Sequence, residues 1–243
     1  MPCYNTSGGF LSSPLPEVLD SVERSIESGI GGIKIKVGHP DPKVDLSRLE
    51  AVARQIDGRV ALMVDANQQW SRAQALRMCR AMEQYGLVWI EEPLDAYDIE
   101  GHAALAAAFD TPIASGEMLV SAGEHFAMIR GKAVDFIQPD AARVGGVTQF
   151  LRVAAMGEEA QLAMAPHFAM ELHVHLSAAY AHDAWVEHFD WLDPLFNERQ
   201  EIADGRMLIS DRPGFGVSLS EQARAWTASS CRIDAAGISD GAL

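Results

Sequence analysis

The chain has 243 residues, of which 48% are hydrophobic and 22% are charged, as is ordinary for a globular protein. Its 34 acidic and 19 basic residues give a formal net charge of −15, so nucleic acid and anionic membranes are poor partners. The sequence has no apolar run long enough for a transmembrane helix, and its N-terminus does not have the pattern of a secretory signal. Its three cysteines, Cys3, Cys79 and Cys231, are scattered and lack metal-ligand spacing, which fits reduced thiols in a cytoplasm.

Eight short apolar runs alternate with stretches of helical periodicity. Continuous apolarity of this kind is typical of parallel strands that are buried on both faces. Between the runs, segments such as 16–29, 71–86 and 147–161 have helical patterns, and Gly29 stands where a helix stop belongs. We therefore predict an α/β fold, a (β/α)8-type TIM barrel over residues 1–200, with an open doubly wound sheet as the alternative. The predicted strands lie at 3–5, 33–37, 61–64, 87–90, 112–115, 136–138, 162–165 and 185–186.

The segment 201–243 departs from this rhythm. Residues 201–211 have two short extended pieces around the Asp-Gly pair at 204–205, which predicts a hairpin. A last helix is expected at 220–227. We therefore treat 201–243 as a tail that follows the barrel.

On the second predicted strand, Lys34 and Lys36 lie two residues apart and point the same way. Ile33 and Ile35 then face the helices, which favours placing both ammonium groups in the barrel mouth over the alternative of solvated lysines on a surface strand. Two crowded cations near a divalent metal lower a lysine pKa, which makes a lysine a competent base near neutral pH.

Three acidic residues follow successive apolar runs at equal intervals of 26 residues: Asp65, Glu91 and Glu117. This interval is about the length of one strand with its covering helix and loops. It places one carboxylate at the C-terminal tip of three successive strands, where barrel enzymes keep their chemistry. A single carboxylate at a strand end could be a helix N-cap, but capping does not require consecutive strands. Converging carboxylates repel unless a hard cation holds them, so the pattern predicts Mg²⁺, with Glu92 turned outward or protonated.

The sixth and seventh runs end at Asp140 and His167, 27 residues apart. On adjacent strand tips the carboxylate can orient the imidazole and raise its pKa, which makes the histidine a competent acid or base. Glu187 ends the eighth run and can hydrogen-bond to a substrate oxygen across the mouth. His173 and His175 lie two apart in a helical segment and cannot share a face, so we interpret them as structural or solvated.

Seven motifs around these residues occur in the order found in the enolase superfamily, and the chain resembles its mandelate racemase subgroup. Longer segments at 3–10, 91–102, 166–171 and 191–198 resemble acid-sugar dehydratases of that subgroup, and the likeness covers nearly the whole chain. The motifs are Lys34-x-Lys36, Val-Asp65-Ala-Asn67, Trp-Ile-Glu91-Glu92-Pro, Ser-Gly-Glu117, Gln-Pro-Asp140, Pro-His167-Phe and Trp-Val-Glu187.

The resemblance implies a role for each residue of the set. It implies that the three spaced carboxylates bind Mg²⁺, which stabilises the enediolate formed when the proton next to a substrate carboxylate is removed. Lys36 and His167 would stand on opposite faces of the substrate carbon. Lys34 would lower the pKa of Lys36 and contact the substrate carboxylate. Asp140 would orient His167, and Glu187 would donate or accept a hydrogen bond at the enediolate.

The function expected from the resemblance is that of a lyase, a Mg²⁺-dependent dehydratase of a hexarate such as galactarate or L-talarate. Racemisation or epimerisation of a 2-hydroxy acid is an alternative, because a two-base site can return a proton to the opposite face. Family members also carry an N-terminal capping domain that closes over the mouth and packs with the tail. Because the chain begins at the first barrel strand, an inactive fragment without that domain is a further alternative. The family's barrels often assemble, which leaves a homo-oligomer open.

Overall fold

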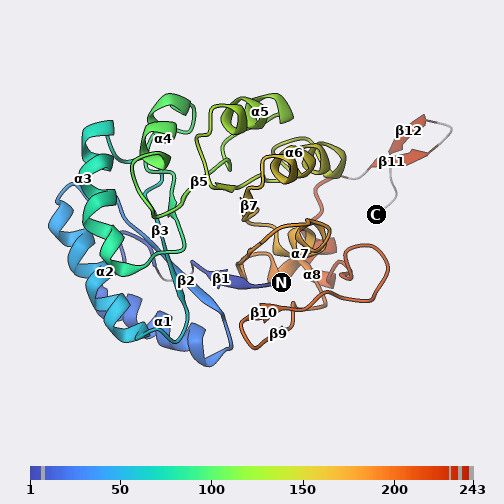
Figure 1. Cartoon of the computed structure of the whole chain (residues 1–243). Coiled ribbons are helices and arrows are strands. Elements are labelled where there is room, and N and C mark those ends of the chain that lie inside the picture. Colours follow the sequence, from blue (N-terminus) through green and yellow to red (C-terminus); the bar gives the residue numbers. More distant parts are fainter. Residues whose placement is uncertain (7–8, 230, 235–236, 241–243) are drawn as a thin grey trace.

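The computed structural model describes residues 1–6, 9–229, 231–234 and 237–240, and its main feature is a curled sheet of eight parallel strands (Figure 1). Seven helices connect the strands and lie outside the sheet. The strands are β1 (Cys3–Asn5), β2 (Gly32–Lys36), β3 (Ala61–Asp65), β4 (Ile90–Glu91), β5 (Ile113–Ser115), β6 (Phe136–Ile137), β7 (Ala163–Met164) and β8 (Val186–His188). The helices are α1 (Leu15–Glu27), α2 (Pro42–Ile56), α3 (Arg72–Met82), α4 (Ile99–Ala106), α5 (Ala122–Arg130), α6 (Val147–Glu159) and α7 (Met170–Ala178).

The strand order is β7-β6-β5-β4-β3-β2-β1-β8. Neighbours in the sheet are therefore neighbours in the chain, except that β8 returns to pair with β1. A doubly wound sheet has helices on both faces, whereas the seven connecting helices here lie outside the curled sheet, so the arrangement differs from that alternative. An isolated parallel bridge also joins Met164 of β7 to Ala184, just before β8, and the Trp185 N–H donates to the Met164 carbonyl at 2.9 Å.

Local sequence explains where the helices begin and end. The side chains of Asp41, Ser71, Asp98 and Ser121 each accept a backbone N–H in the first turn of the helix that follows, as N-cap residues do. After α1, Gly29 has φ +86°, a left-handed conformation that glycine adopts without steric cost. The expected helix stop at this position is therefore confirmed.

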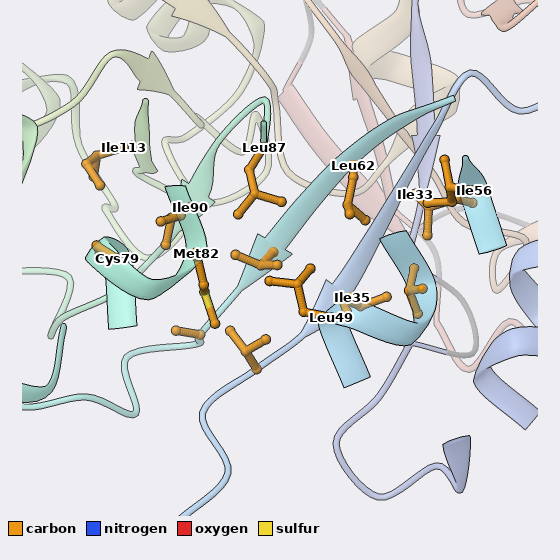
Figure 2. Packing of buried hydrophobic residues seen from close by; sticks show 14 of the residues in the cluster. Ile33, Ile35, Leu49, Ile56, Leu62, Cys79, Met82, Leu87, Ile90 and Ile113 are labelled. Carbon is orange, nitrogen blue, oxygen red and sulfur yellow. The ribbon is translucent and has the colours of Figure 1, made fainter. Parts of the chain in front are cut away.

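The two faces of the sheet carry different side chains. Ile33, Ile35 and Leu62 face outward and pack with residues of α2 and α3, such as Leu49 and Met82 (Figure 2). This confirms the outward orientation expected for the two isoleucines. Inward-facing residues form a separate aromatic floor, made of Tyr4, Trp89, Phe136 and Trp185.

The tail begins with an antiparallel hairpin, β9 (Ile202–Ala203) and β10 (Arg206–Met207), as the Asp-Gly pair predicts. Asp204 and Gly205 both have positive φ, as a tight hairpin turn requires. The hairpin packs on the start of β1, because Cys3 N–H donates to the Gly205 carbonyl at 3.1 Å. The last helix, α8 (Glu221–Ala225), is shorter than expected, and sequence reasoning missed a second hairpin, β11 (Cys231–Asp234) with β12 (Gly237–Asp240).

Among the described residues, none of the helices has the length and apolar character needed to cross a membrane.

Candidate active site

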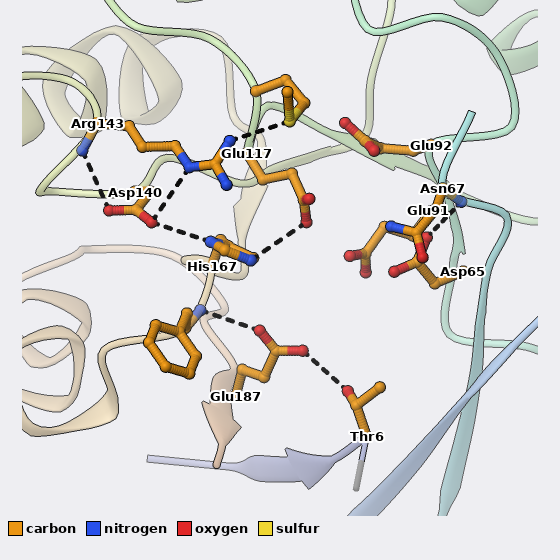
Figure 3. A network of polar contacts seen from close by, with 12 residues as sticks. Thr6, Asp65, Asn67, Glu91, Glu92, Glu117, Asp140, Arg143, His167 and Glu187 are labelled. Atoms are coloured by element: carbon orange, nitrogen blue, oxygen red, sulfur yellow. Dashed lines mark hydrogen bonds and ion pairs between the residues drawn. The ribbon is translucent and has the colours of Figure 1, made fainter. Parts of the chain in front are cut away.

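The three evenly spaced carboxylates converge at one end of the sheet (Figure 3). Asp65 is the last residue of β3, Glu91 is the last residue of β4, and Glu117 follows β5 by two residues. One oxygen atom from each lies within 4.8 Å of the others, and all three residues are buried. The equal spacing in the sequence therefore corresponds to a common place in the fold, because parallel strands end at the same edge.

Crowding of these carboxylates changes their proton affinity. Burial, together with the nearby charge of Glu91, raises the pKa of Asp65. Burial, with Glu91 and Asp65 nearby, raises the pKa of Glu117 to about 7. Three buried oxygen ligands that repel one another are the donor set that a hard divalent cation such as Mg²⁺ prefers. The residues present therefore fit such a cation.

Glu92, which directly follows Glu91 in the chain, is a fourth buried acid beside the three carboxylates. It is fully buried, so its side chain does not turn outward into solvent. Burial and the charges of Glu117 and Asp65 raise the pKa of Glu92 to about 8, so the protonated form is favoured near neutral pH. Gln68 Nε2 donates to one Glu92 oxygen at 2.9 Å. Of the two alternatives for this acid, burial is inconsistent with the outward-turned one.

Lys34 is buried inside the curled sheet, as the two-residue periodicity predicts. Its Nζ lies 2.7 Å from Glu91 Oε1, 2.9 Å from Glu187 Oε1 and 3.7 Å from Asp65 Oδ2. Burial alone would lower the pKa of Lys34, but the carboxylates of Glu187 and Glu91 raise it well above its ordinary value. Burial alone would raise the pKa of Glu91 and Glu187, but the positive charge of Lys34 contributes to lowering both pKa values below their ordinary range. Lys34 is thus a fixed positive charge.

Lys36 lies one pleat farther along β2 and differs from Lys34 in exposure. Its ammonium group forms a hydrogen-bonded ion pair with Asp65, and its side chain is 17% exposed, against 1% for Lys34. Lys36 therefore reaches the surface of the cavity while still in contact with a residue of the carboxylate cluster.

His167 lies between two carboxylates (Figure 3). Its Nδ1 is 2.9 Å from Asp140 Oδ2, and its Nε2 is 3.6 Å from Glu117 Oε2. Burial would lower the pKa of His167, but the hydrogen bond to Asp140 and the charge of Glu117 raise it. This is the pairing predicted from the two strand tips. Asp140 is itself held in place by the Ala142 N–H, which donates to Oδ1 at 2.8 Å.

Glu187, on β8, has its carboxylate fixed by three donors. Besides Lys34, Thr6 Oγ1 donates to Oε1 at 2.9 Å and the Phe168 N–H donates to Oε2 at 2.9 Å. Sequence reasoning missed Thr6. Thr6 follows the first apolar run in the chain, so the strand-tip argument used for the acids would have found it.

The two helix histidines behave as expected. Both lie in α7, where His173 is buried and His175 is in contact with the tail. His173 Nε2 accepts the Ala141 N–H at 3.1 Å, and its Nδ1 lies 2.6 Å from the Phe168 carbonyl. His173 therefore has a structural role next to the loops that carry the site.

Lys36 and His167 line one cavity of about 290 Å³. This volume is at the lower end of the range for small-molecule sites. Its apolar side is an aromatic wall that sequence reasoning missed, because the four residues come from separated loops. Phe10 and Trp191 stack with ring centroids 6.1 Å apart and planes at 18°. The wall consists of Phe10, Phe168, Phe189 and Trp191.

A larger hollow of about 850 Å³ lies outside the sheet and is lined by residues of α4, α5 and α6. It contains none of the predicted site residues. The smaller cavity is therefore the better candidate for chemistry, since polar and titratable groups converge there.

Both a family model and individual known proteins are similar in sequence to this chain. The enolase C-terminal domain-like family matches residues 17–223. An L-talarate/galactarate dehydratase of Salmonella typhimurium is 61% identical over 95% of this chain and 58% of its own length. A 3,6-anhydro-alpha-L-galactonate cycloisomerase of Streptomyces coelicolor is 34% identical over 90% of this chain and 61% of its own length.

Among solved structures, the L-talarate dehydratase from Polaromonas sp. JS666 complexed with Mg and L-glucarate superposes with a TM-score of 0.91. It is 62% identical, with 93% of this chain and 63% of that chain covered. The chain thus spans about three fifths of the length of these relatives. Because the family model matches most of this chain, the chain belongs to the enolase C-terminal domain-like family.

Proposed function

We propose that this chain carries the catalytic centre of a Mg²⁺-dependent acid-sugar dehydratase, a hydro-lyase acting on a hexarate such as L-talarate or galactarate. The observation that carries the proposal is the convergence of three buried carboxylates beside the cavity that Lys36 and His167 line. The dehydratases that the chain resembles supply the substrate class, because they are named for these acid sugars.

Asp65, Glu91 and Glu117 would hold Mg²⁺, and their crowded, buried oxygens support this assignment. When bound there, Mg²⁺ supplies positive charge that stabilises the negative charge developing on a substrate carboxylate. Lys36 and His167 are the proton-transfer groups, since both line the cavity and each contacts one member of the carboxylate cluster.

In the dehydration, one of the two bases takes the proton from the carbon next to the substrate carboxylate. The C–O bond to the β-hydroxyl then breaks, and the leaving oxygen receives a proton from an acid and departs as water. The enol that is left becomes a 2-keto acid. Asp140 orients His167, Lys34 supplies a fixed positive charge, and Glu187 faces the substrate from across the cavity.

We also propose that the eight strands close into a barrel formed by residues 1–200, with 201–243 as a tail. The bridge between Met164 and Ala184 supports closure, because it joins β7 to the segment that leads into β8. The strand order supports it as well, since β8 pairs with β1.

The test is to incubate the purified chain with Mg²⁺ and a panel of aldarates and to assay for 2-keto acid. We expect keto acid from at least one hexarate, and none when Mg²⁺ is replaced by a chelator. Absence of keto acid from every aldarate would overturn the proposal for this chain.

Racemisation is the second candidate, because Lys36 and His167 line the same cavity. Running the reaction in D₂O separates the two, since deuterium exchange or inversion without keto acid would favour the racemase.

A further inference from the structure

Helix α2 buries a carboxylate that binds the loop directly after Lys36. Asp45 is fully buried, and its Oδ2 accepts hydrogen bonds from the Gly38 N–H at 2.8 Å and the His39 N–H at 3.0 Å. Capping of the helix does not require it, because Asp41 is the N-cap and accepts the Lys43 N–H at 3.0 Å. A buried charge costs free energy unless it is hydrogen-bonded, so these backbone contacts account for its place.

Arg48, one helical turn later, binds a different loop. It is 7% exposed, and its guanidinium donates to the Phe10 carbonyl at 2.7 Å, the Leu11 carbonyl at 3.1 Å and the Ser13 carbonyl at 3.0 Å. This loop connects β1 to α1. A planar guanidinium with several fixed donors can hold three carbonyl groups in one geometry, which a single ammonium group cannot do.

Both loops adjoin Lys36: one follows it directly in the chain, and the other is hydrogen-bonded to its backbone. The Lys36 N–H donates to the Gly9 carbonyl at 2.7 Å, which ties its backbone to the loop that Arg48 holds. That loop is packed against β2, since a Cβ added to Gly9 would lie 2.9 Å from the Lys34 carbonyl oxygen. The same loop carries Phe10, which lines the cavity and stacks on Trp191.

We propose that Asp45 and Arg48 are positioning residues that clamp the two loops and thereby hold Lys36 and the Phe10 side of the aromatic wall in reacting geometry. The inference rests on the proposed function only for the role of Lys36 as a base. Neither residue touches the cavity, so each acts through backbone. Misplacing a reacting group by about 1 Å can reduce a rate roughly 100-fold, so a clamp of this kind affects turnover.

The test compares Arg48→Met with Arg54→Met in the full chain. Arg54 lies on the same helix, but its side chain is 77% exposed and its partner is Glu50 at 2.7 Å, so its replacement is a matched control. Two quantities are measured for each variant: kcat and KM per folded molecule, and backbone amide exchange resolved to single residues. Arg48→Lys is the third variant, since it keeps the charge but not the fork of donors.

For Arg48→Met we expect kcat to fall at least 10-fold and the Lys36 amide to exchange at least 10-fold faster, while the amides of β3 keep their rates. Arg54→Met should change neither quantity, and Arg48→Lys should lie between the two. If the amides of Lys36 and β3 accelerate equally and kcat per folded molecule is unchanged, Arg48 only stabilises the fold and the proposal is wrong. Unchanged Lys36 exchange in Arg48→Met would also overturn it.

The exchange measurement is independent of turnover. If the wild-type chain makes no keto acid, the proposed function fails, whereas the exchange of the Lys36 amide still decides whether Arg48 clamps the loop.

Discussion

Two sides of the cavity hold their charges in different ways. On the lysine side (Lys34, Lys36, Asp65, Glu91 and Glu187), Lys34 is buried and its Nζ lies within 3 Å of the Glu91 and Glu187 carboxylates, so its charge is paired. On the histidine side (His167, Asp140 and Glu117), the imidazole is 22% exposed and has a carboxylate near each ring nitrogen. A buried ion cluster can therefore provide fixed charges in a site, while a more exposed group beside it exchanges protons.

The largest expected effect is on turnover, from replacing a proton-transfer group on either side. His167→Asn and Lys36→Met should each lower kcat by about 10²- to 10⁴-fold, since general acid–base groups contribute that much. His167→Asn should lower the free energy of unfolding by about 1–3 kcal/mol, because it removes the imidazole partner of the buried Asp140 carboxylate. Steady-state kinetics and urea unfolding in Mg²⁺ measure the two quantities. A variant with near wild-type kcat would remove its residue from the mechanism.

The second prediction is that a substitution on the lysine side lowers the free energy of unfolding more than one on the histidine side. Lys34→Met leaves Glu91 and Glu187 buried without their shared counter-charge. Breaking a buried ion pair by removing one partner costs about 3–5 kcal/mol of unfolding free energy. Urea unfolding without added Mg²⁺ checks this value, with His167→Asn under the same conditions as the comparison. Equal losses for the two variants would show that the two sides do not differ in the proposed way.

The third prediction concerns removal of the cation. Without it, the raised pKa values of Glu117 and Glu92, about 7 and about 8, lie above their unfolded values. A group with a raised folded-state pKa stabilises the fold while protonated, and this contribution is lost as the pH rises through that value. In chelator, the melting temperature should therefore fall as the pH increases from about 5 to about 9.

Saturating Mg²⁺ should counter this loss. At roughly 100 times its Kd, a bound ligand adds about 2.7 kcal/mol to the free energy of unfolding. Glu91→Gln should abolish most of the gain, because it removes one of the three converging carboxylates. A melting temperature that does not respond to Mg²⁺ at pH 8 in the wild type would contradict the metal assignment.

The smallest effect is expected from Asp140→Asn on the histidine side. The neutral amide no longer stabilises the imidazolium, so the pKa of His167 should fall from its raised value. The loss in kcat should be smaller than the roughly 10²- to 10⁴-fold contribution of the acid–base group itself. NMR titration of His167 and the pH profile of kcat measure the two effects, and the limb of the profile due to His167 should move to lower pH. An unchanged titration would show that Asp140 does not set the pKa.

Much of the fold was predictable from apolar runs and spacing. The eight strands were expected within a few residues of their observed positions. The largest difference is at β4, in which only two residues pair in the ladder. The hairpin at 204–205 followed from local turn chemistry. The β11–β12 hairpin was missed, since its strands carry a weak apolar signal in the sequence.

The candidate site was predictable where its residues lie at a strand end or within the next few residues, and was not where the contacts join separate loops. Asp65, Glu91 and Lys34 were found because strand periodicity and parallel ends fix their direction. The aromatic wall and the contacts of Arg48 could not be found in this way. They join loops that lie far apart in the chain, and no local pattern encodes such pairing.

The spacing of residues along the chain was enough to predict which chemistry-bearing residues share one end of the sheet, because parallel strands joined by helices all end at the same edge. It also determined that both lysines of β2 point inward, because side chains alternate along a strand. The burial of Glu92, the pairing of Lys34 with two carboxylates and the contacts around Lys36 come from the tertiary structure. These depend on burial and on distances between residues far apart in the chain, and electrostatic energies are set by those two quantities.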